Sequence, residues 1–214
     1  MTIYENFIKL LDAYNKEKAF TYALEQLNNG SLSVVELYEQ ILKPSLNNWN
    51  CNHEINKLCI WQEHIRSSII RSIIEGCYPY ILKEKEKTKS LEYTVAVVCP
   101  PDEQHELGAR LVTDYFTING FKTTFVGSNT PVESFIEAIR KYKFDYIAIS
   151  VTNYYHLFKT KKLIQYIRSV SSETKIVVGG RAFQERKNFY KELGADYLIE
   201  NIDDISKLKG NVAI

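Results

Sequence analysis

The stretch YTVAVVCPPDEQHELGAR, residues 93–110, decides the fold of this chain. It begins with a run of mostly apolar and β-branched residues, a composition that favours a buried strand. From Leu107 onward the apolar residues recur at helical spacing, so a helix follows after a short polar loop. The loop carries His105 between Glu103 and Glu106. The sequence therefore predicts a strand-to-helix connection with an imidazole and two carboxylates just beyond the strand.

The same alternation of strand and helix continues to residue 200. Strands are predicted over 93–99, 122–127, 146–152, 175–180 and 195–200. Helices are predicted between them, over 107–119, 131–142, 157–170 and 184–193. Strands that alternate with helices of this length form parallel βαβ units. We therefore expect an α/β domain of the flavodoxin-like type, built on a five-stranded parallel sheet.

The N-terminal part of the chain has a different character, with helical periodicity and no strand signal. Ser33 with Glu36 fits a capping box at the start of a third helix, and a fourth, long helix is predicted to start near His53. This pattern predicts an all-α part, a four-helix bundle over residues 1–88. The α/β domain is then expected over residues 89–214.

The composition excludes several classes of protein. The formal net charge is +1, so we expect no direct binding to nucleic acid or to an anionic membrane surface. There is no run of 18 apolar residues, and the N-terminal segment is charged throughout, so neither a membrane span nor a secretory signal is predicted. The four cysteines show no framework spacing and are predicted to be free thiols of a cytoplasmic protein.

The predicted loop around His105 has the chemistry of a metal site. In a parallel sheet, ligands bind beyond the carboxyl ends of the strands, and His105 lies at that edge. Glu103 can accept a hydrogen bond from one ring nitrogen of His105, which leaves the other nitrogen able to bind a metal. Gly108 and the pair Gly179–Gly180 would allow a bulky group to approach the backbone.

These residues resemble the fingerprint of the cobalamin (vitamin B12)-binding domain family. The family reads Asp-x-His-x-x-Gly, then Ser-x-Leu or Ser-x-Thr, then Gly-Gly; here EQHELG (103–108), SVT (150–152) and GG (179–180) follow in that order. The resemblance implies that His105 replaces the cofactor's own base as lower ligand of cobalt and that Glu103 orients it. The residues implied to flank the displaced nucleotide tail are Gly108, Ser150, Thr152, Gly179 and Gly180, with Ser128 as a further candidate.

Two branches of this family place a helical bundle before such a domain. One contains the methyl-carrying corrinoid proteins of methyltransferase systems, and the other the CarH-type adenosylcobalamin photoreceptors. The methyl carriers typically read GD-x-HDIG, whereas EQHELGAR (103–110) and GGRAF (179–183) look more like the photoreceptors. The resemblance therefore favours a light sensor that binds adenosylcobalamin and lacks the MerR-type DNA-binding domain. Such a sensor is expected to act through a protein partner or as a homo-oligomer.

The N-terminal part adds a second point of resemblance to the photoreceptors, which carry a Trp and then a Glu-His pair in the bundle. Here Trp49 is followed by Glu63 and His64. The resemblance implies that the Trp packs beside the adenosyl group and that His64 binds cobalt from above after light breaks the carbon–cobalt bond. The gap between Trp49 and Glu63 is longer than is usual in the family, so Trp61 is the alternative for the aromatic role.

Other interpretations of the same residues stay open. The chain could be a corrinoid methyl carrier with methylcobalamin as its cofactor, or a storage or delivery module for cobalamin. His64 could be a half-buried histidine paired with a carboxylate, and the two Trp residues could be plain bundle core. Cys51, His53, Cys59 and His64 could together hold zinc, although their spacing matches no short zinc pattern.

Overall fold

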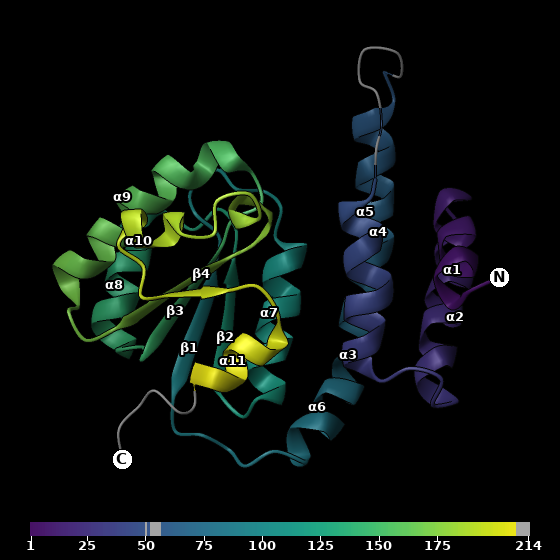
Figure 1. Cartoon of the computed structure of the whole chain (residues 1–214), viewed down its shortest axis with the longest axis horizontal. Helices are drawn as coiled ribbons and strands as arrows, with labels where there is room; N and C mark the ends of the chain where they lie inside the picture. Colours follow the sequence, from purple (N-terminus) through teal and green to yellow (C-terminus); the bar gives the residue numbers. More distant parts are fainter. Residues whose placement is uncertain (50, 52–56, 209–214) are drawn as a thin grey trace. The chain divides into compact units, whose positions relative to one another are not determined.

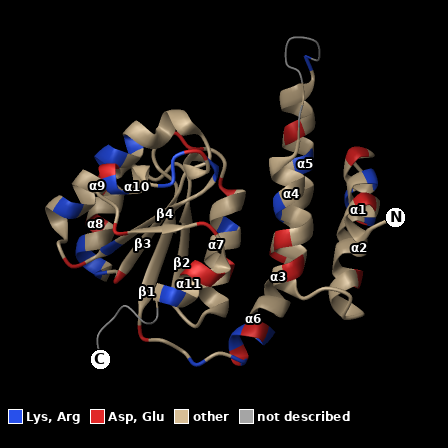
Figure 2. Cartoon of the chain, in the orientation of Figure 1, with Lys and Arg blue, Asp and Glu red and all other residues tan. Residues whose placement is uncertain are grey.

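The computed structural model describes residues 1–49, 51 and 57–208 of the chain (Figure 1). The chain divides into two compact units, Met1–Glu84 and Lys85–Ile214, and each unit is described by itself. The sequence-based division was at residue 88. Side chains of both charges occur in each unit, as Figure 2 shows. Among the described residues, no helix combines the length and the apolar character needed to cross a membrane.

The first unit is helical and confirms the expected N-terminal all-α part. Its helices are α1 (Ile3–Asp12), α2 (Lys16–Asn28), the continuous run of α3 (Val34–Glu36), η1 (Leu37–Leu42) and α4 (Lys43–Asn47), and then α5 (Cys59–Gly76). Helix α2 packs against α1 and α5, and η1 packs against α1 and α2. The interface is apolar because each helix directs one buried stripe inward; examples are Phe7, Leu11, Tyr38 and Ile70.

The ends of these helices follow the sequence closely in some places and not in others. The capping box predicted for Ser33 and Glu36 is present in both directions. The predicted start of the fourth helix near His53 lies outside the described residues. The long helix also does not continue to residue 82, because α5 ends at Gly76 and α6 (Tyr78–Glu86) starts as a separate helix. Pro79, with no N–H and with its ring against the preceding turn, cannot continue α5.

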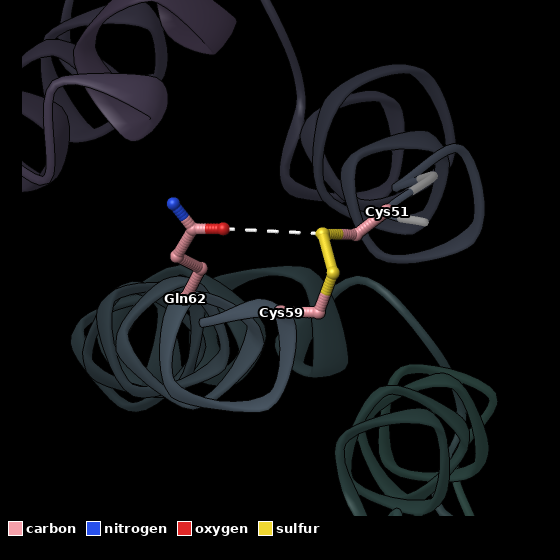
Figure 3. The surroundings of a disulfide bond; sticks show 3 residues. All are labelled: Cys51, Cys59 and Gln62. Atoms are coloured by element: carbon pink, nitrogen blue, oxygen red, sulfur yellow. Dashed lines mark hydrogen bonds between the residues drawn. A yellow bond between two sulfur atoms is a disulfide. The ribbon is translucent and has the colours of Figure 1, made fainter. Parts of the chain in front are cut away.

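The prediction that all four cysteines are free thiols was wrong. Cys51 and Cys59 form a disulfide, with their Cα atoms 5.7 Å apart, a normal separation for such a bond (Figure 3). A sulfur of this bond, Cys51 Sγ, lies 3.9 Å from Gln62 Oε1. Cys77 and Cys99 are free and buried. Spacing along the chain could not show that Cys51, eight residues before the first residue of α5, lies beside that residue in space.

The disulfide also removes the zinc interpretation, because it occupies two of the four proposed ligands. A third, His53, lies outside the described residues. Among the residues that the structure describes, no group of three or more His, Cys, Asp or Glu side chains is placed to hold a metal ion.

The second unit is an α/β domain with the expected five-stranded parallel sheet. The strands are β1 (Thr94–Val98), β2 (Lys122–Gly127), β3 (Tyr146–Ser150), β4 (Lys175–Gly179) and β5 (Tyr197–Ile199), in the order β2-β1-β3-β4-β5. This is the flavodoxin-like order, and it brings the carboxyl ends of β1 and β3 side by side at the centre of the sheet. In the register of β3 with β4, Ser150 pairs with Gly179.

Helices cover both faces of this sheet, as Figure 1 shows. Helices α7 (Leu107–Ile118) and α11 (Ile202–Leu208) lie on one face, and α8 (Val132–Tyr142), α9 (Leu157–Val170) and α10 (Phe189–Leu193) lie on the other. The predicted helix over 184–193 was too long: residues 184–188 form bends and turns, and the short α10 begins only at Phe189. A 3₁₀ turn, η3 (Arg181–Phe183), comes before them. Helix α11 was not predicted. The central strands β1 and β3 are buried on both sides, which explains their continuous apolar character.

Candidate functional site

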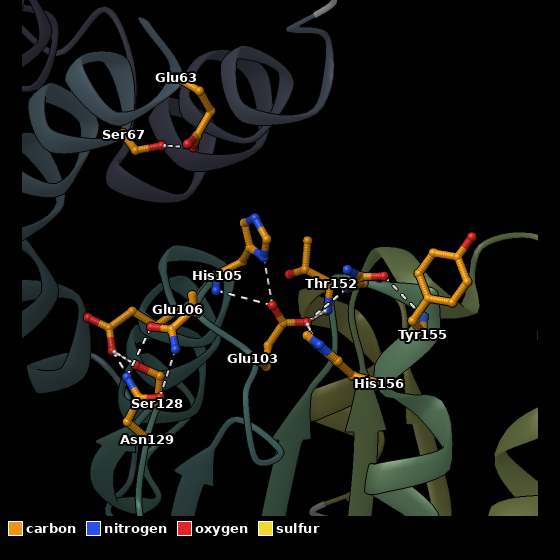
Figure 4. Close-up of polar contacts among 12 residues, drawn as sticks. Glu63, Ser67, Glu103, His105, Glu106, Ser128, Asn129, Thr152, Tyr155 and His156 are labelled. Carbon is orange, nitrogen blue, oxygen red and sulfur yellow. Dashed lines mark hydrogen bonds and ion pairs between the residues drawn. The ribbon is translucent and has the colours of Figure 1, made fainter. Parts of the chain in front are cut away.

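The centre of the candidate site is the loop between β1 and α7. Two prolines, Pro100 and Pro101, end the strand because proline cannot donate to a sheet. Asp102 then has a left-handed backbone (φ 66°), which turns the chain back toward the sheet. As a result, the side chain of Glu103 enters the protein while that of His105 stays at the surface (Figure 4).

Glu103 is fully buried (0% exposed) and is surrounded by N–H groups. Its Oε1 accepts hydrogen bonds from the backbone N–H of His105 (3.1 Å) and from His105 Nδ1 (2.6 Å). Its Oε2 lies 3.0 Å from the Thr152 nitrogen and 2.8 Å from the Asn153 nitrogen, both beyond the end of β3. His156 Nδ1 lies 3.1 Å from the same oxygen. The carboxylate therefore joins the loop after β1 to the loop after β3.

These contacts decide the charge of Glu103. Burial by itself raises the pKa of this carboxyl, but hydrogen bonds from the His105 ring, the Asn153 backbone and the His156 ring outweigh burial. Together they hold the pKa of Glu103 well below its usual range. Glu103 is therefore a carboxylate at neutral pH, although no part of it reaches the solvent.

The charge of Glu103 in turn decides the state of His105. A carboxylate only accepts hydrogen bonds, so His105 Nδ1 carries the proton in the contact with Glu103. In the neutral ring Nε2 is then unprotonated, and the side chain is 56% exposed. A nitrogen lone pair on a fixed, outward-facing ring is the usual state of a histidine that binds a metal.

The loop is also attached on its other side, to the segment that follows β2. Gln104 and Asn129 exchange two amide hydrogen bonds, of 2.8 and 3.0 Å. Glu106 Oε2 accepts hydrogen bonds from the Ser128 hydroxyl (3.0 Å) and from the Ser128 backbone N–H (3.3 Å). Ser128 was predicted to flank a nucleotide tail, and in this structure its hydroxyl is engaged with Glu106.

Close backbone contacts within the protein explain two of the glycines of the predicted site. A Cβ atom on Gly180 would lie 2.4 Å from the carbonyl oxygen of Val151, and the residue has φ +107°. A Cβ atom on Gly179 would lie 2.7 Å from the carbonyl oxygen of Ile199. Both glycines thus allow neighbouring backbones to approach closely. A Cβ atom on Gly108 would meet Ser150 Oγ at 3.7 Å, an ordinary contact, so the start of α7 lies close to the end of β3.

The free thiol nearest this loop in sequence does not compete as a metal ligand. Cys99 follows β1 and is buried. Burial, with added repulsion from the charges of Glu103 and Glu106, raises the pKa of Cys99 to about 12. The thiol therefore keeps its proton at neutral pH, and a protonated thiol is a poor metal ligand.

The donor set fits a metal whose other ligands come from a macrocycle. The loop offers a single outward imidazole nitrogen, with its ring fixed from behind by a buried carboxylate. Such an arrangement is suited to one axial position of a metal that is already bound in a ring of equatorial nitrogens. The cobalt of cobalamin is a metal of this kind, so His105 and Glu103 fit the roles that the resemblance implies, as lower ligand and as the residue that orients it.

Of the predicted residues of the helical unit, Trp49 and Glu63 line one pocket, together with Arg66 and Ser67. Trp49 is half-buried, and the Arg66 guanidinium lies 4.4 Å from the centre of its ring. Trp61 is 68% exposed, so its interpretation as bundle core was wrong. The side chain of His64 is 74% exposed, which contradicts a half-buried histidine; its Nε2 lies 3.6 Å from Glu63 Oε2. Glu63 accepts a hydrogen bond from Ser67 (2.5 Å; Figure 4).

Sequence reasoning did not predict the contacts that attach the loop, which are made by His156, Gln104, Glu106 and Asn129. The segment TNYYH (152–156) directly follows a predicted strand end, so a histidine there was a usable signal. The amide pair between Gln104 and Asn129 had no such signal, because 25 residues separate its members.

Comparisons with known proteins give the family of this chain and several relatives. The family model described as "B12 binding domain" matches residues 93–203, more than half of the 214-residue chain. The chain is 25% identical to trimethylamine corrinoid protein 1 of Methanosarcina mazei over 199 residues, which cover 92% of this chain and 90% of that protein. It is 27% identical to the trimethylamine corrinoid protein of Methanosarcina barkeri over 143 residues, which cover 65% of this chain and 64% of that protein.

The fold is also found in a solved structure. The monomethylamine corrinoid protein of Methanosarcina barkeri superposes with a TM-score of 0.81 and 18% identity, covering 97% of this chain and 96% of that one. The matches do not support the photoreceptor branch that the loop EQHELGAR indicated, and they fit the corrinoid-protein branch better. A glutamate in place of an aspartate adds one methylene, and Glu103 still contacts His105. This substitution therefore did not distinguish the two branches.

Proposed function

This chain belongs to the B12-binding domain family, and from that premise we propose that it is a corrinoid protein of a methyltransferase system, a non-catalytic carrier of methyl groups. The observation that carries the proposal is the pair of Glu103 and His105. A buried carboxylate holds one ring nitrogen, and the other ring nitrogen faces outward. The names of the corrinoid proteins that match most of the chain support the carrier function.

In this proposal, His105 Nε2 would hold the cobalt of cobalamin, and Glu103 would keep the His105 ring in place. The small residues at the neighbouring strand ends flank the nucleotide tail: Gly108, Ser128, Ser150, Thr152, Gly179 and Gly180. When bound, the cobalt supplies the atom that accepts and releases the methyl group. The chain's own part is to fix the imidazole and to keep the loops after β1, β2 and β3 joined through Glu103, Gln104 and Glu106.

The helical unit is proposed to be the cap of this domain, with the division near residues 84–88. A carrier needs one protein that loads the methyl group and another that removes it, so two protein partners are proposed. The names of the relatives point to a methylated amine as the source of the methyl group. Methylcobalamin is then the loaded form of the cofactor.

The lower ligand is tested by loading the whole chain with hydroxocobalamin and recording its absorbance. The wild type is expected to give the spectrum of cobalamin with a histidine ligand in place of its own base. His105→Ala is expected to give a spectrum without a nitrogen ligand and to bind at least about 100-fold more weakly, above the range for residues that only orient a ligand. An unchanged spectrum and affinity in His105→Ala would sink the proposed site.

The carrier function is tested with methylcobalamin-loaded protein in the dark. Transfer of the methyl group to a thiol, in the presence of a methylcobalamin:thiol methyltransferase, supports a carrier. A protein that binds the cofactor tightly but never releases the methyl group supports the storage module instead.

A second candidate, light sensing with adenosylcobalamin, is favoured by one observation in the helical unit. The His64 side chain is exposed on α5, which leaves it accessible to a ligand. If His64 is the upper ligand after illumination, light will change the absorbance and the size of the adenosylcobalamin-loaded protein, and His64→Ala will alter the photoproduct. In that case Trp49 or Trp61 is the aromatic neighbour of the adenosyl group. A carrier is expected to be indifferent to His64→Ala.

A further inference from the structure

Exposed aromatic side chains gather at α9 and the turn before it. Of the five large apolar or aromatic side chains that are exposed in the described part of the second unit, four lie between residues 154 and 166. Among these four, Tyr155 is 84% and Phe158 is 66% exposed, and the other two are Tyr154 and Tyr166. Single exposed apolar side chains are common in proteins, but a group of them marks a binding surface.

Helix α9 carries large apolar side chains on both of its faces. Its inner face is buried in the core of the α/β domain, through residues such as Leu163 and Ile167. A helix at the surface of a protein normally directs polar side chains outward. On the outer face of α9, however, Phe158, Lys162 and Tyr166 follow each other at intervals of four residues and therefore lie in one row. The two exposed rings are not needed for the core, so we looked for a role outside it.

The same segment has an excess of positive charge. Residues 154–191 contain nine Lys and Arg and two Asp and Glu, whereas the whole chain contains 27 and 26. The rest of the chain is therefore more acidic than basic, and blue segments are frequent on α9 in Figure 2. Lys159 is paired with Asp102, but no ion pair of Lys161 or Lys162 occurs among the described residues.

The positive groups lie against the exposed rings. Lys162 Nζ is 4.7 Å from the centre of the Phe158 ring, and the guanidinium carbon of Arg186 is 5.8 Å from the centre of the Tyr154 ring. Such contacts hold a cation beside a ring at the surface. Aromatic side chains and arginine supply much of the binding energy of protein interfaces. We call this surface the aromatic–basic face, and its residues are Tyr154, Tyr155, Phe158, Lys161, Lys162 and Arg186.

The aromatic–basic face begins at the carboxyl edge of the sheet, where the candidate site lies. The 3₁₀ turn η2 (Tyr154–His156) comes shortly after β3, and His156 contacts Glu103. The ring of the neighbouring Tyr155 points away from Glu103, as Figure 4 shows. A protein that reaches a ligand held by His105 must bind near this edge, because ligands of such sheets lie beyond the carboxyl ends of the strands.

We propose that the aromatic–basic face is the docking surface for an acidic face of the protein partner that takes the methyl group. The inference deepens the proposed function and rests on it, because a carrier needs such a partner. Opposite charges speed the encounter of two proteins, and the rings add contact area once the proteins have met. A nucleic acid fits less well, because the acidic remainder of the chain would repel its phosphates.

The first test measures methyl transfer to a thiol by a methylcobalamin:thiol methyltransferase, in the dark, at several concentrations of the methylcobalamin-loaded chain. Lys161→Glu combined with Lys162→Glu should raise the KM for the loaded chain about tenfold and leave kcat within about twofold. The reason is that these charges act on association and lie away from the reacting atoms. Added salt should raise the KM of the wild type much more than that of the variant, because salt screens the attraction.

The matched control is Lys141→Glu combined with Lys143→Glu. It makes the same change of charge beside another exposed ring, that of Tyr142 at the end of α8. The control should leave the KM within about twofold of wild type. Phe158→Ser tests the rings and should raise the KM about tenfold at low and at high salt, because this loss is one of contact area. Circular dichroism checks that each variant is folded.

A binding measurement separates the failure of this inference from the failure of the proposed function. The loaded chain should bind labelled poly-L-glutamate at low salt, and the change at Lys161 and Lys162 should weaken this binding at least about tenfold. If the wild type transfers no methyl group but binds the polymer in this way, the carrier function fails while the surface still takes an acidic protein. If transfer occurs and the KM is unchanged in the variant, the function stands and this inference alone is wrong.

Three further results would overturn the inference. An equal rise of the KM in the control at Lys141 and Lys143 would show a general effect of charge. Tighter binding of polyuridylate than of poly-L-glutamate, lost in the variant at Lys161 and Lys162, would assign the face to a nucleic acid. Dimers of the wild type in sedimentation velocity, dissociated by the same change, would assign it to a second copy of the chain.

Discussion

The loop after β1 and the start of α5 both carry a Glu and a His close together, yet the two regions differ in their surroundings. In the loop, Glu103 is buried and contacts groups from two strand ends, and it fixes His105. On α5, Glu63 is half-buried, and the neighbouring His64 is exposed and 3.6 Å from it. A Glu next to a His in the sequence therefore says little about how firmly the imidazole is held.

The difference teaches that the support of an imidazole comes from segments distant in sequence. Thr152, Asn153 and His156 lie about 50 residues after Glu103, and they reach it because β1 and β3 are neighbours in the sheet. A helix offers its residues mainly partners three or four positions away, such as Ser67 for Glu63.

The difference between the two regions is tested most directly by removing each carboxylate in turn and measuring the loss of stability. Glu103→Leu leaves five N–H donors directed at a buried side chain that no longer accepts hydrogen bonds. We expect it to lower the free energy of unfolding by about 3–5 kcal/mol, as when one partner of a buried ionic group is removed. Glu63→Leu should cost less than about 1 kcal/mol. Urea titrations measure both, and equal losses would show that the two carboxylates are equivalent.

A second test compares a glycine of each unit. Gly180 has φ +107°, and a Cβ atom there would meet the Val151 carbonyl, so we expect Gly180→Ala to cost about 2–3 kcal/mol. Gly30 also has a positive φ, +73°, but no atom lies within 4 Å of its Cβ position. Gly30→Ala should therefore cost only about 1 kcal/mol, from the backbone alone. Thermal unfolding monitored by circular dichroism would contradict this account if the order were reversed.

The charge of Glu103 leads to a third prediction, about acid. Its pKa is lowered in the folded state, while the unfolded chain takes up the proton near the ordinary value of 4.5. The stability from this group is thus fully present above that pH and is lost as the pH falls further toward the lowered folded pKa. The slope is up to about 1.4 kcal/mol per pH unit. Urea midpoints of wild type and Glu103→Gln, measured from pH 6 to pH 3, should converge in acid; parallel curves would contradict an ionised Glu103.

The smallest effect is expected at His64. Its side chain is exposed and lies on a helix surface, so His64→Ala should change the free energy of unfolding by less than about 0.5 kcal/mol. The same urea titration measures it. A loss above about 1 kcal/mol would mean that His64 is a structural residue. Its side chain would then not be free to bind cobalt, as the sensor candidate requires.

Much of the α/β unit could be predicted because its signals are local. The run TVAVV of β1 and the periodic apolar residues of α7 are read within single segments, and alternation of such segments indicates a parallel sheet. The helix over 184–193 was predicted too long because residues 184–188, which form bends and turns ahead of α10, contain no Gly or Pro that would have marked the break. The break of α5 before Tyr78 had a signal, Pro79, that the long apolar pattern concealed.

The candidate site, too, has contacts that could be predicted from the sequence and contacts that could not. Glu103 and His105 were predicted as a pair because they are two residues apart, and their hydrogen bond needs only the loop. The contacts of Glu103 with the segment after β3, and of Glu106 with Ser128, were not predicted. They depend on which strands are neighbours and on how far each strand extends.

The amino-acid sequence by itself determined that this chain is a helical unit followed by a five-stranded α/β unit, with an imidazole beside a carboxylate where the first strand ends. Those features follow from the periodicity of apolar residues and from neighbours along the chain. Only the tertiary structure decided that Glu103 is buried and ionised, that it joins two imidazoles, and that Cys51 lies beside Cys59. The physical reason is that a buried charge is stable only where several segments bring their N–H groups to it. The sequence of any one segment does not determine which other segments will lie beside it.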